Sequence, residues 1–482
     1  MQKFYFSFVF LCNSLIGFSQ IPDLPTPYNI TPSSAFPVPR TITSTDIKNS
    51  IKFPNAVNST IDSKVQQLNE ALVKETQTHI NEQIEEQKKQ LYYRQQEKEF
   101  AQTYFLPSLS DKAGATAYYS AFENLSKLNP EDYSIADATF FVENAFYNND
   151  KSFQNIYQNY IQKAVKIIRS EITKNKISDD DNTSKNLTLF QYFSGDTKQN
   201  GKIVHKATKY DFDDYWGAKD YSKMFVSKLM RTNTGQCHSM PLLYLILAEQ
   251  IGAEASLVLS PNHSYIRFED NDGEMLNAEL TNGMFTANSF VLNNGYIKSE
   301  ALQNKMYMQN LTKKELLSQT FVDLASGYIH KFGYDEFVGK ILDKAQQLNP
   351  NNINAVLWES NLNQERFVKA CNNLGINPND KDELQKIKNF PELIAQLRNI
   401  NGQFDFIDQS GFTQMPAEQY EKWLGSLQRA ENKQRSDEIL EKIKAIEAQK
   451  RKEAQQRELQ QKIKKVIPKK EAPKVYWIPL LT

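Results

Sequence analysis

Cysteine is scarce in this chain, since 482 residues contain only three. So few cysteines exclude a disulfide-stapled scaffold, and because no Cys-x-x-Cys pair occurs, we expect no metal site. An excess of charge of one sign is also missing, because Lys plus Arg and Asp plus Glu number 57 each. A chain without a net field gives no reason to expect an anionic partner, so we predict no nucleic-acid binding.

Long apolar runs are missing everywhere except at the N-terminus. It reads MQKFYFSFVFLCNSLIGFSQ, with Lys3 ahead of an apolar run and Gly17-Phe18-Ser19 in the small-x-small pattern of signal cleavage. A retained membrane anchor is the alternative, but the run is short for a bilayer and no strongly basic segment follows it. We therefore expect a signal peptide at residues 1–19, an exported protein that is periplasmic or extracellular, and no integral membrane span.

Removal of the signal peptide leaves two cysteines, Cys237 and Cys371. They could form a disulfide in an oxidising compartment, although the sequence does not give their distance. A large domain with its own core does not need that link. We therefore expect a free thiol at Cys237.

The composition, 40% hydrophobic and 12% aromatic, is sufficient for a buried core and indicates two or three domains. Residues 20–59 are rich in Pro, Ser and Thr and predict an extended segment, whereas a sparse apolar stripe predicts a long amphipathic helix at 60–105. For that helix a dimeric coiled coil is the alternative. The expected segments after it are a helical region at 106–215, an α+β domain at 216–310, a helical hairpin at 311–365, a helical region at 366–430, a charged helix at 431–467 and an apolar tail at 468–482.

The predicted hairpin has the pattern FVDLASGYIHKFGYDEFVGKILDKAQQLNPNN. Leu324 and Tyr328 lie on one helical face, Gly333 marks a turn, and Pro350 ends the second helix. The pattern resembles a tetratricopeptide repeat with a one-residue insertion at the turn, and an ordinary helical hairpin fits it equally well. The helical flanks and the final apolar residues, KVYWIPLLT, are candidate surfaces for a protein partner.

Cys237 stands just before the longest apolar stretch of the interior, TGQCHSMPLLYLILAEQIG. Apolar residues nearly all round predict a buried helix with Gly252 as its C-terminal cap, and Pro241 is tolerated only near the helix start. A thiol at or next to that start is exposed to unpaired N–H groups and the helix dipole, which favour the nucleophilic thiolate. The backbone N–H groups of Gln236 and His238 are candidates to hold an oxyanion, and Gly235 is expected to let a substrate backbone approach.

A predicted hairpin follows, in which ASLVLSPNHSYIRFED and EMLNAEL flank Asn-Asp-Gly at 271–273. A three-residue loop with Gly273 in the left-handed conformation pairs residue 265 with residue 279 and makes Glu279 a diagonal neighbour of His263. Asn277 then lies on the same face as an alternative partner for the histidine. A two-residue loop would put His263 and Glu279 on opposite faces, so the pair depends on the register.

These residues resemble the transglutaminase-like superfamily. The matching features are Gly-Gln-Cys at a helix start, a glycine fifteen positions after Cys237, a strand histidine at 263 with an aromatic residue two positions later, and an acid sixteen positions after the histidine. Their order and spacing are similar to those of the family. The resemblance covers roughly residues 216–290. It implies an α+β, papain-like core flanked by mainly α-helical regions, with Cys237 as nucleophile, His263 as general base and acid, and Glu279 where the family usually has Asp.

The resemblance implies a cysteine-dependent acyl-transfer enzyme acting on a peptide or protein amide, as a peptidase, an amidase or a cross-linking enzyme. No cofactor is needed for that chemistry. The alternative from another class is a catalytically silent domain that serves as a scaffold, with the helical flanks binding a protein partner. The reactivity of Cys237 separates the two predictions.

Overall fold

The computed structural model describes residues 70–71, 73–85, 104–286, 288, 291–292, 297–413 and 415–427, with scattered positions between 437 and 457. The chain divides into two compact units, Met1–Gly425 and Ser426–Thr482. The predicted signal peptide, the extended segment at 20–59 and the apolar tail lie outside the described residues. The described positions at 70–85 and 437–457 are helical, as expected for the amphipathic and charged helices, whose other residues lie outside the description.

The buried helix predicted after Cys237 is the centre of the first unit. It is α8, Ser239–Ile251, and it packs against four other helices and against β5 and β6 of the main sheet. Its residues from Met240 to Ala248 are all buried, which explains the apolar sequence all round the helix. The surrounding helices are α4 (Ile135–Phe146), α5 (Lys151–Lys174), α6 (Asn182–Ser194) and α7 (Val226–Thr232).

The segment predicted as helical at 106–215 begins as expected and then changes character. It contains α3 (Ala115–Ser126) and α4 to α6, but its end forms three short strands, β1 (Thr197–Gln199), β2 (Lys202–His205) and β3 (Lys209–Tyr210). The prediction of helix throughout is therefore wrong for these residues. Because α4, α5 and α6 pack directly on α8, the expected boundary at residue 216 does not separate two cores.

The main sheet is antiparallel, with strand order β5-β6-β7-β8. β6 pairs with β7 in the register of the three-residue loop, with Arg267 opposite Asn277 and Glu269 opposite Met275. The Asp270 N–H donates to the Glu274 carbonyl at 2.9 Å, and Gly273 has φ +87°. The predicted register is confirmed. The strands are β5 (Ser256–Ser260), β6 (His263–Glu269), β7 (Met275–Glu279) and β8 (Met284–Thr286).

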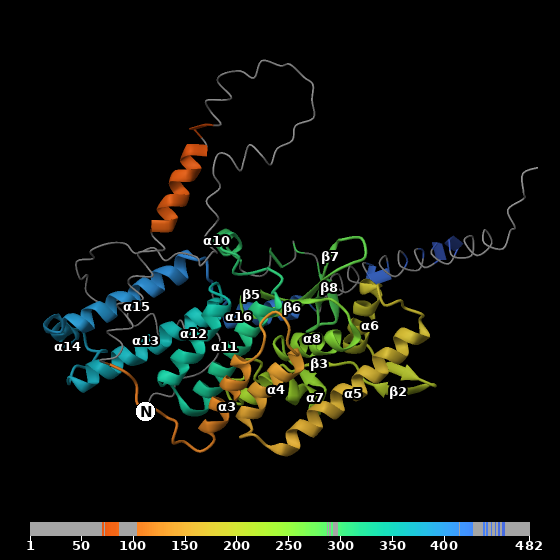
Figure 1. Cartoon of the computed structure of the whole chain (residues 1–482), viewed down its shortest axis with the longest axis horizontal. Helices are drawn as coiled ribbons and strands as arrows, with labels where there is room; N and C mark the ends of the chain where they lie inside the picture. Colours follow the sequence, from red (N-terminus) through yellow and green to blue (C-terminus); the bar gives the residue numbers. More distant parts are fainter. Residues whose placement is uncertain are drawn as a thin grey trace, which may run out of the picture. The chain divides into compact units, whose positions relative to one another are not determined.

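Helices dominate the described chain after the sheet, and the predicted hairpin is present. α11 and α12 pack against each other across Gly333, and α13 packs on α12 and α15, as their grouping in Figure 1 shows. The structure is thus mixed α and β, with small sheets and a majority of helix. The helices are α10 (Ser299–Gln303), α11 (Lys313–Phe332), α12 (Glu336–Leu348), α13 (Ile353–Asn373), α14 (Lys381–Leu384), α15 (Pro391–Gln409) and α16 (Ala417–Leu427).

The turn between α15 and α16 is fixed by a close backbone approach. Gly411 has φ +88°, and a Cβ built on it would lie 2.3 Å from the backbone nitrogen of Ala301. Only glycine fits there, because any side chain would collide with α10. The contact fixes the point from which the chain runs back toward the sheet. Within the described helices, none is both long and apolar enough to cross a membrane.

Candidate functional site

Cys237 lies immediately before the buried helix rather than on it. α8 begins at Ser239 with His238 as its N-terminal cap, two residues later than a helix starting at Cys237 would. The Ser239 hydroxyl oxygen accepts the Gln236 N–H at 3.0 Å. This N–H is therefore already used, and the expectation that Gln236 offers a free N–H to an oxyanion is wrong. Among the described residues, none accepts a hydrogen bond from the backbone N–H groups of Cys237 and His238.

Gly235 has a packing role instead of the predicted one. It lies in β4 (Thr234–Gly235), which pairs in parallel with β3. A Cβ at this position would lie 2.7 Å from the Met240 side chain and 3.1 Å from that of Leu229, so protein atoms already fill the space. The expectation that Gly235 admits a substrate backbone is not met. The glycine lets β4 pass close to α7 and α8, and so places Cys237.

His263 and Glu279 form a buried pair on the main sheet. The His263 Nε2 and the Glu279 Oε2 lie 2.6 Å apart, with side chains 2% and 5% exposed. The other carboxylate oxygen accepts from the N–H and the hydroxyl of Thr281 at 3.1 and 2.7 Å. Both oxygens of Glu279 are thus engaged, which fixes the orientation of the imidazole ring through its Nε2.

Asn277, the alternative partner for the histidine, is occupied elsewhere. Its side-chain oxygen accepts from Arg267 Nε at 2.7 Å, and its amide nitrogen donates to Asn288 at 2.8 Å. Arg267 is itself buried and also donates to the Tyr265 hydroxyl at 3.0 Å. The side chain that contacts His263 is therefore Glu279 and not Asn277.

The thiol of Cys237 and the imidazole of His263 influence each other's ionisation. Burial opposes the charged thiolate, but the contact with His263 and the charge of its ring outweigh burial and hold the Cys237 pKa below its usual value. Burial likewise opposes the imidazolium, but the Glu279 charge and the Cys237 contact raise the His263 pKa to about 10. At neutral pH both directions favour a thiolate beside an imidazolium.

The nitrogen of His263 that remains for the thiol is Nδ1. It is buried, and among the described residues it has no hydrogen bond of good geometry. The contact between this nitrogen and Cys237 is therefore loose. The thiol instead donates weakly to the Asn262 carbonyl at 3.9 Å, and the Ser264 hydroxyl donates to the Cys237 carbonyl. Both contacts tie the start of β6 to the turn before α8.

His238, although adjacent to Cys237, has a different partner. Its Nε2 lies 3.3 Å from a carboxylate oxygen of Asp323 on α11. Burial opposes its charge, but the Asp323 carboxylate raises the His238 pKa above its usual value. The side chain of His238 thus joins the start of α8 to α11 and does not pair with Cys237. Only its backbone N–H remains a candidate for the site.

Two residues of α16, which the sequence did not place near Cys237, cover the site. The Tyr420 hydroxyl donates to the Cys237 sulfur at 3.6 Å, and the Trp423 ring meets the His263 ring edge-on at 4.5 Å between centroids. Their spacing of three residues marks one face of a helix, which is a signal visible in the sequence. Nothing in the sequence says which surface this face meets.

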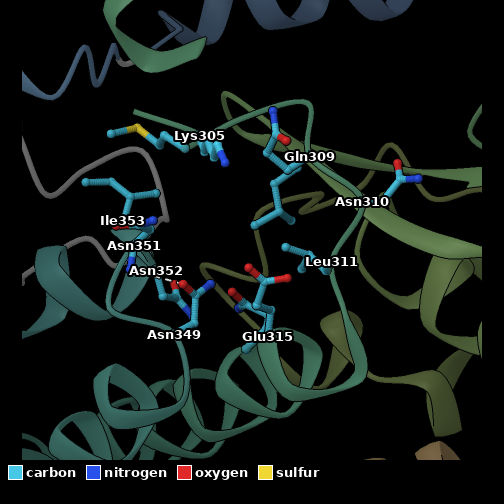
Figure 2. Close-up of a pocket in the computed structure, with 12 residues that line it drawn as sticks. Lys305, Gln309, Asn310, Leu311, Glu315, Asn349, Asn351, Asn352 and Ile353 are labelled. Atoms are coloured by element: carbon cyan, nitrogen blue, oxygen red, sulfur yellow. Dashed lines mark hydrogen bonds between the residues drawn. The ribbon is translucent and has the colours of Figure 1, made fainter. Parts of the chain in front are cut away.

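A separate pocket lies between the segment after α10 and the turn between α12 and α13 (Figure 2). Lys305 and Gln309 come from the first segment, and Asn349 and Asn352 from the second. Its acid, Glu315, accepts the Thr312 N–H in the capping box of α11, and Asn352 caps α13. These two polar groups thus serve the ends of helices, and the pocket contains neither the thiol nor the histidine pair.

Comparison with known proteins adds no relative to this geometry. No family model matches the chain, and no curated protein or solved structure matches it. The resemblance to the transglutaminase-like superfamily therefore stays a prediction.

Cys237 and Cys371 are both free thiols, so the expected free thiol at Cys237 is confirmed. Within the described residues, no cluster of three or more His, Cys, Asp or Glu side chains is arranged to hold a metal.

Proposed function

We propose that this chain is an exported cysteine-dependent acyl-transfer enzyme with a transglutaminase-like core. The observation that supports it best is the buried His263–Glu279 pair next to the thiol of Cys237, whose pKa is lowered while that of the histidine is raised. Burial alone would shift both pKa values the other way. A structural cysteine has no need of such a partner. The proposed export depends on the sequence of residues 1–19.

The proposed reaction begins with attack of the Cys237 thiolate on the carbonyl carbon of an amide. A carbon–sulfur bond forms, and the N–H groups of Cys237 and His238 hold the negative oxygen. The His263 imidazolium gives its proton to the leaving nitrogen, the carbon–nitrogen bond breaks, and a thioester remains. Glu279 keeps the ring oriented and stabilises its charge throughout.

The second half of the reaction returns the thiol. His263, now neutral, takes a proton from water or from an amine, which attacks the thioester carbon and displaces the Cys237 sulfur. Water gives hydrolysis, whereas an amine gives a new amide and so a cross-link. The proposed substrate is a peptide or protein amide. No cofactor takes part in either half.

The thioester is the species that tests this proposal. The purified full chain is treated with p-nitrophenyl acetate, and the acetylated protein is digested and mapped by mass spectrometry. We expect acetylation at Cys237, released by hydroxylamine and absent in Cys237→Ala. Cys371→Ala is the matched control and should acylate normally. Acylation that persists in Cys237→Ala, or that is no slower in His263→Ala, contradicts the mechanism.

A second function, the silent scaffold that binds a protein partner, is favoured by one observation. Cys237 is only 8% exposed and Tyr420 is hydrogen-bonded to its sulfur, so the thiol is closed to solvent in this conformation. The scaffold predicts that the thiol resists acylation even when α16 is removed from it. It also predicts that deletion of residues 474–482 weakens complex formation. If the chain is an enzyme, the same deletion should leave its activity largely unchanged, because residues 474–482 take no part in the proposed catalysis.

A further inference from the structure

The cover over Cys237 is a well-fitted contact rather than a loose overlap. Tyr420 is fully buried, and its ring lies 4.8 Å from that of Trp216 and 5.4 Å from that of Tyr215. Its hydroxyl lies 3.1 Å from the hydroxyl of Tyr210. Since Tyr420 donates to the Cys237 sulfur, Tyr210 is the donor in that second bond. Three aromatic side chains from outside α16 thus form a socket that holds one more ring.

The elements that build the socket also build the site. Tyr210 belongs to β3, whose partner strand β4 leads directly to Cys237, and the Asp211 N–H donates to the Gly235 carbonyl at 2.8 Å. Tyr215 and Trp216 follow in the same loop. The socket and the thiol thus lie at the ends of the same two paired strands, β3 and β4.

The chain ahead of Tyr420 contacts the site through its backbone as well. The Asn262 side-chain amide donates to the Met415 carbonyl at 3.1 Å, and Asn262 immediately precedes His263. Met415 is buried, and Gly411 fixes the start of the segment against α10. One backbone carbonyl is thus recognised next to the histidine, and one side chain is inserted beside the thiol. A bound peptide would make the same two kinds of contact.

We propose that the segment Met415–Trp423, with Tyr420 inserted beside Cys237, is an internal mimic of the substrate, and that the socket of Tyr210, Tyr215 and Trp216 is the subsite for an aromatic side chain of a peptide substrate. This inference rests on the proposed function. In the closed state, with Tyr420 beside Cys237, the segment prevents reagents from reaching the thiol. Catalysis then requires the segment to leave, and a tyrosine or phenylalanine of the substrate takes the place of Tyr420.

The chemistry of the socket supports an aromatic side chain over other classes. Stacked and tilted rings favour a flat partner with centroids 4.5–7 Å away, and burial of one ring contributes more than burial of a small aliphatic group. The Tyr210 hydroxyl offers one hydrogen bond at the far end, which a tyrosine uses and a phenylalanine leaves to water. An acidic side chain would lose its hydration among these rings and would lie beside the negatively charged Cys237 thiolate.

The first experiment measures closure. Full-length protein is treated with iodoacetamide at pH 7, and labelling of Cys237 is followed by mass spectrometry. In Tyr420→Ala we expect labelling at least about tenfold faster than in the wild type, because opening costs less when the socket is empty. Glu418→Ala changes an exposed residue of the same helix and is the matched control. Equal rates in the wild type and Tyr420→Ala overturn the closure.

The second experiment measures the subsite in the Tyr420→Ala background. Peptide aldehydes that carry Phe, Ala or Glu next to the reactive group compete with iodoacetamide for the thiol. We expect the Phe peptide to protect at least about tenfold better than the Ala peptide, and Trp216→Ala to remove most of that difference. Equal protection by the Phe and Ala peptides overturns the aromatic subsite. If Tyr420→Ala does not fold, Trp423→Leu loosens the same helix and takes its place.

Failure of this inference and failure of the proposed function give different results. If Cys237 becomes accessible in Tyr420→Ala but forms no thioester with an activated ester, the function fails and the closure stands. If the wild type already forms the thioester at the rate of Tyr420→Ala, the function stands and the mimic fails. Loss of acylation in Tyr420→Phe, which keeps the ring, would make the hydroxyl part of the catalytic machinery and overturn the mimic.

Discussion

The molecule has two buried cysteines in two regions, and they ionise in opposite senses. Cys371 on α13 is fully buried among side chains such as Phe367, Leu393 and Leu397, and burial raises the pKa of its thiol to about 11. Cys237 is almost as buried, yet its pKa is lowered, because His263 and Tyr420 outweigh the effect of burial. Burial alone therefore does not predict the reactivity of a thiol. A neighbouring side chain that can share a proton with the thiol decides its reactivity.

The two regions also differ in how their polar groups are satisfied. The environment of Cys371 is apolar, so a neutral thiol is its stable form. The environment of Cys237 is polar. The carboxylate of Glu279 pairs with the imidazole of His263, which lies beside the thiol, and the phenol of Tyr420 donates to the sulfur. Such a buried network persists only if its members are paired, which makes each member sensitive to substitution.

The largest expected effect comes from removing the partner of Cys237. His263→Ala should slow acylation of Cys237 at pH 7 by roughly 10²-fold or more, because the thiolate loses its counter-ion and the thiol becomes mostly protonated. The rate is measured with p-nitrophenyl acetate. His330→Ala, whose ring stacks on Tyr221 away from the thiol, is the matched control. A rate within about threefold of wild type would remove His263 from the mechanism.

A smaller effect is expected from Glu279→Gln, which keeps the shape and removes the charge. The raised His263 pKa of about 10 should fall, because its largest raising influence is the Glu279 charge. The imidazolium is then lost at lower pH, so we expect the alkaline decline of activity to begin at a lower pH in Glu279→Gln than in the wild type. Glu269→Gln, exposed at the end of β6, should leave the profile unchanged. If the pH profile of activity in Glu279→Gln is also unshifted from that of the wild type, His263 is not paired with Glu279.

The next effect is on stability and compares the two thiols directly. Cys371→Ser should lower the free energy of unfolding by about 1–3 kcal/mol, because a hydroxyl there is buried among apolar side chains. Cys237→Ser should cost less, since Tyr420 and the Asn262 carbonyl already offer hydrogen bonds at that position. Urea unfolding of both variants measures the difference. A larger cost at Cys237 would reverse the comparison.

The smallest expected effect is that of Cys371→Ala on the site. The two cysteines belong to separate clusters, so acylation and labelling of Cys237 should stay within about twofold of wild type. Stability should fall modestly through loss of packing. A large change in Cys237 reactivity would mean that α13 and the site are coupled.

The sequence predicted the parts of the site that depend on local rules. Pro241 and Gly252 bracketed α8, and Asn-Asp-Gly set the hairpin register that joins His263 to Glu279. Its preference for Glu279 left Asn277 open as an alternative, because both lie on one face and the choice depends on Arg267, which binds the asparagine. Periodicity also missed the strands at 197–210, which are two to four residues long and too short to show alternation.

Long-range contacts account for the rest. Tyr420 and Trp423 reach Cys237 and His263 from the far end of the compact unit, and no local pattern announces such a contact. The role of Gly235 depended likewise on Met240 and Leu229, which only the folded chain brings together. The sequence identified Cys237, His263 and Glu279 as candidates. Only the folded structure shows that Tyr420 and Trp423 cover them.

The proposed chemistry depends on an ion pair between Cys237 and His263 at neutral pH. The decisive measurement is the pH dependence of the alkylation rate of Cys237 in Tyr420→Ala, with Cys371→Ser as background. We expect a thiolate well below the reference thiol pKa of about 8.5, and a return to that value or above in His263→Ala. A thiol that titrates near 8.5 with and without His263 would exclude the ion pair and favour the silent scaffold.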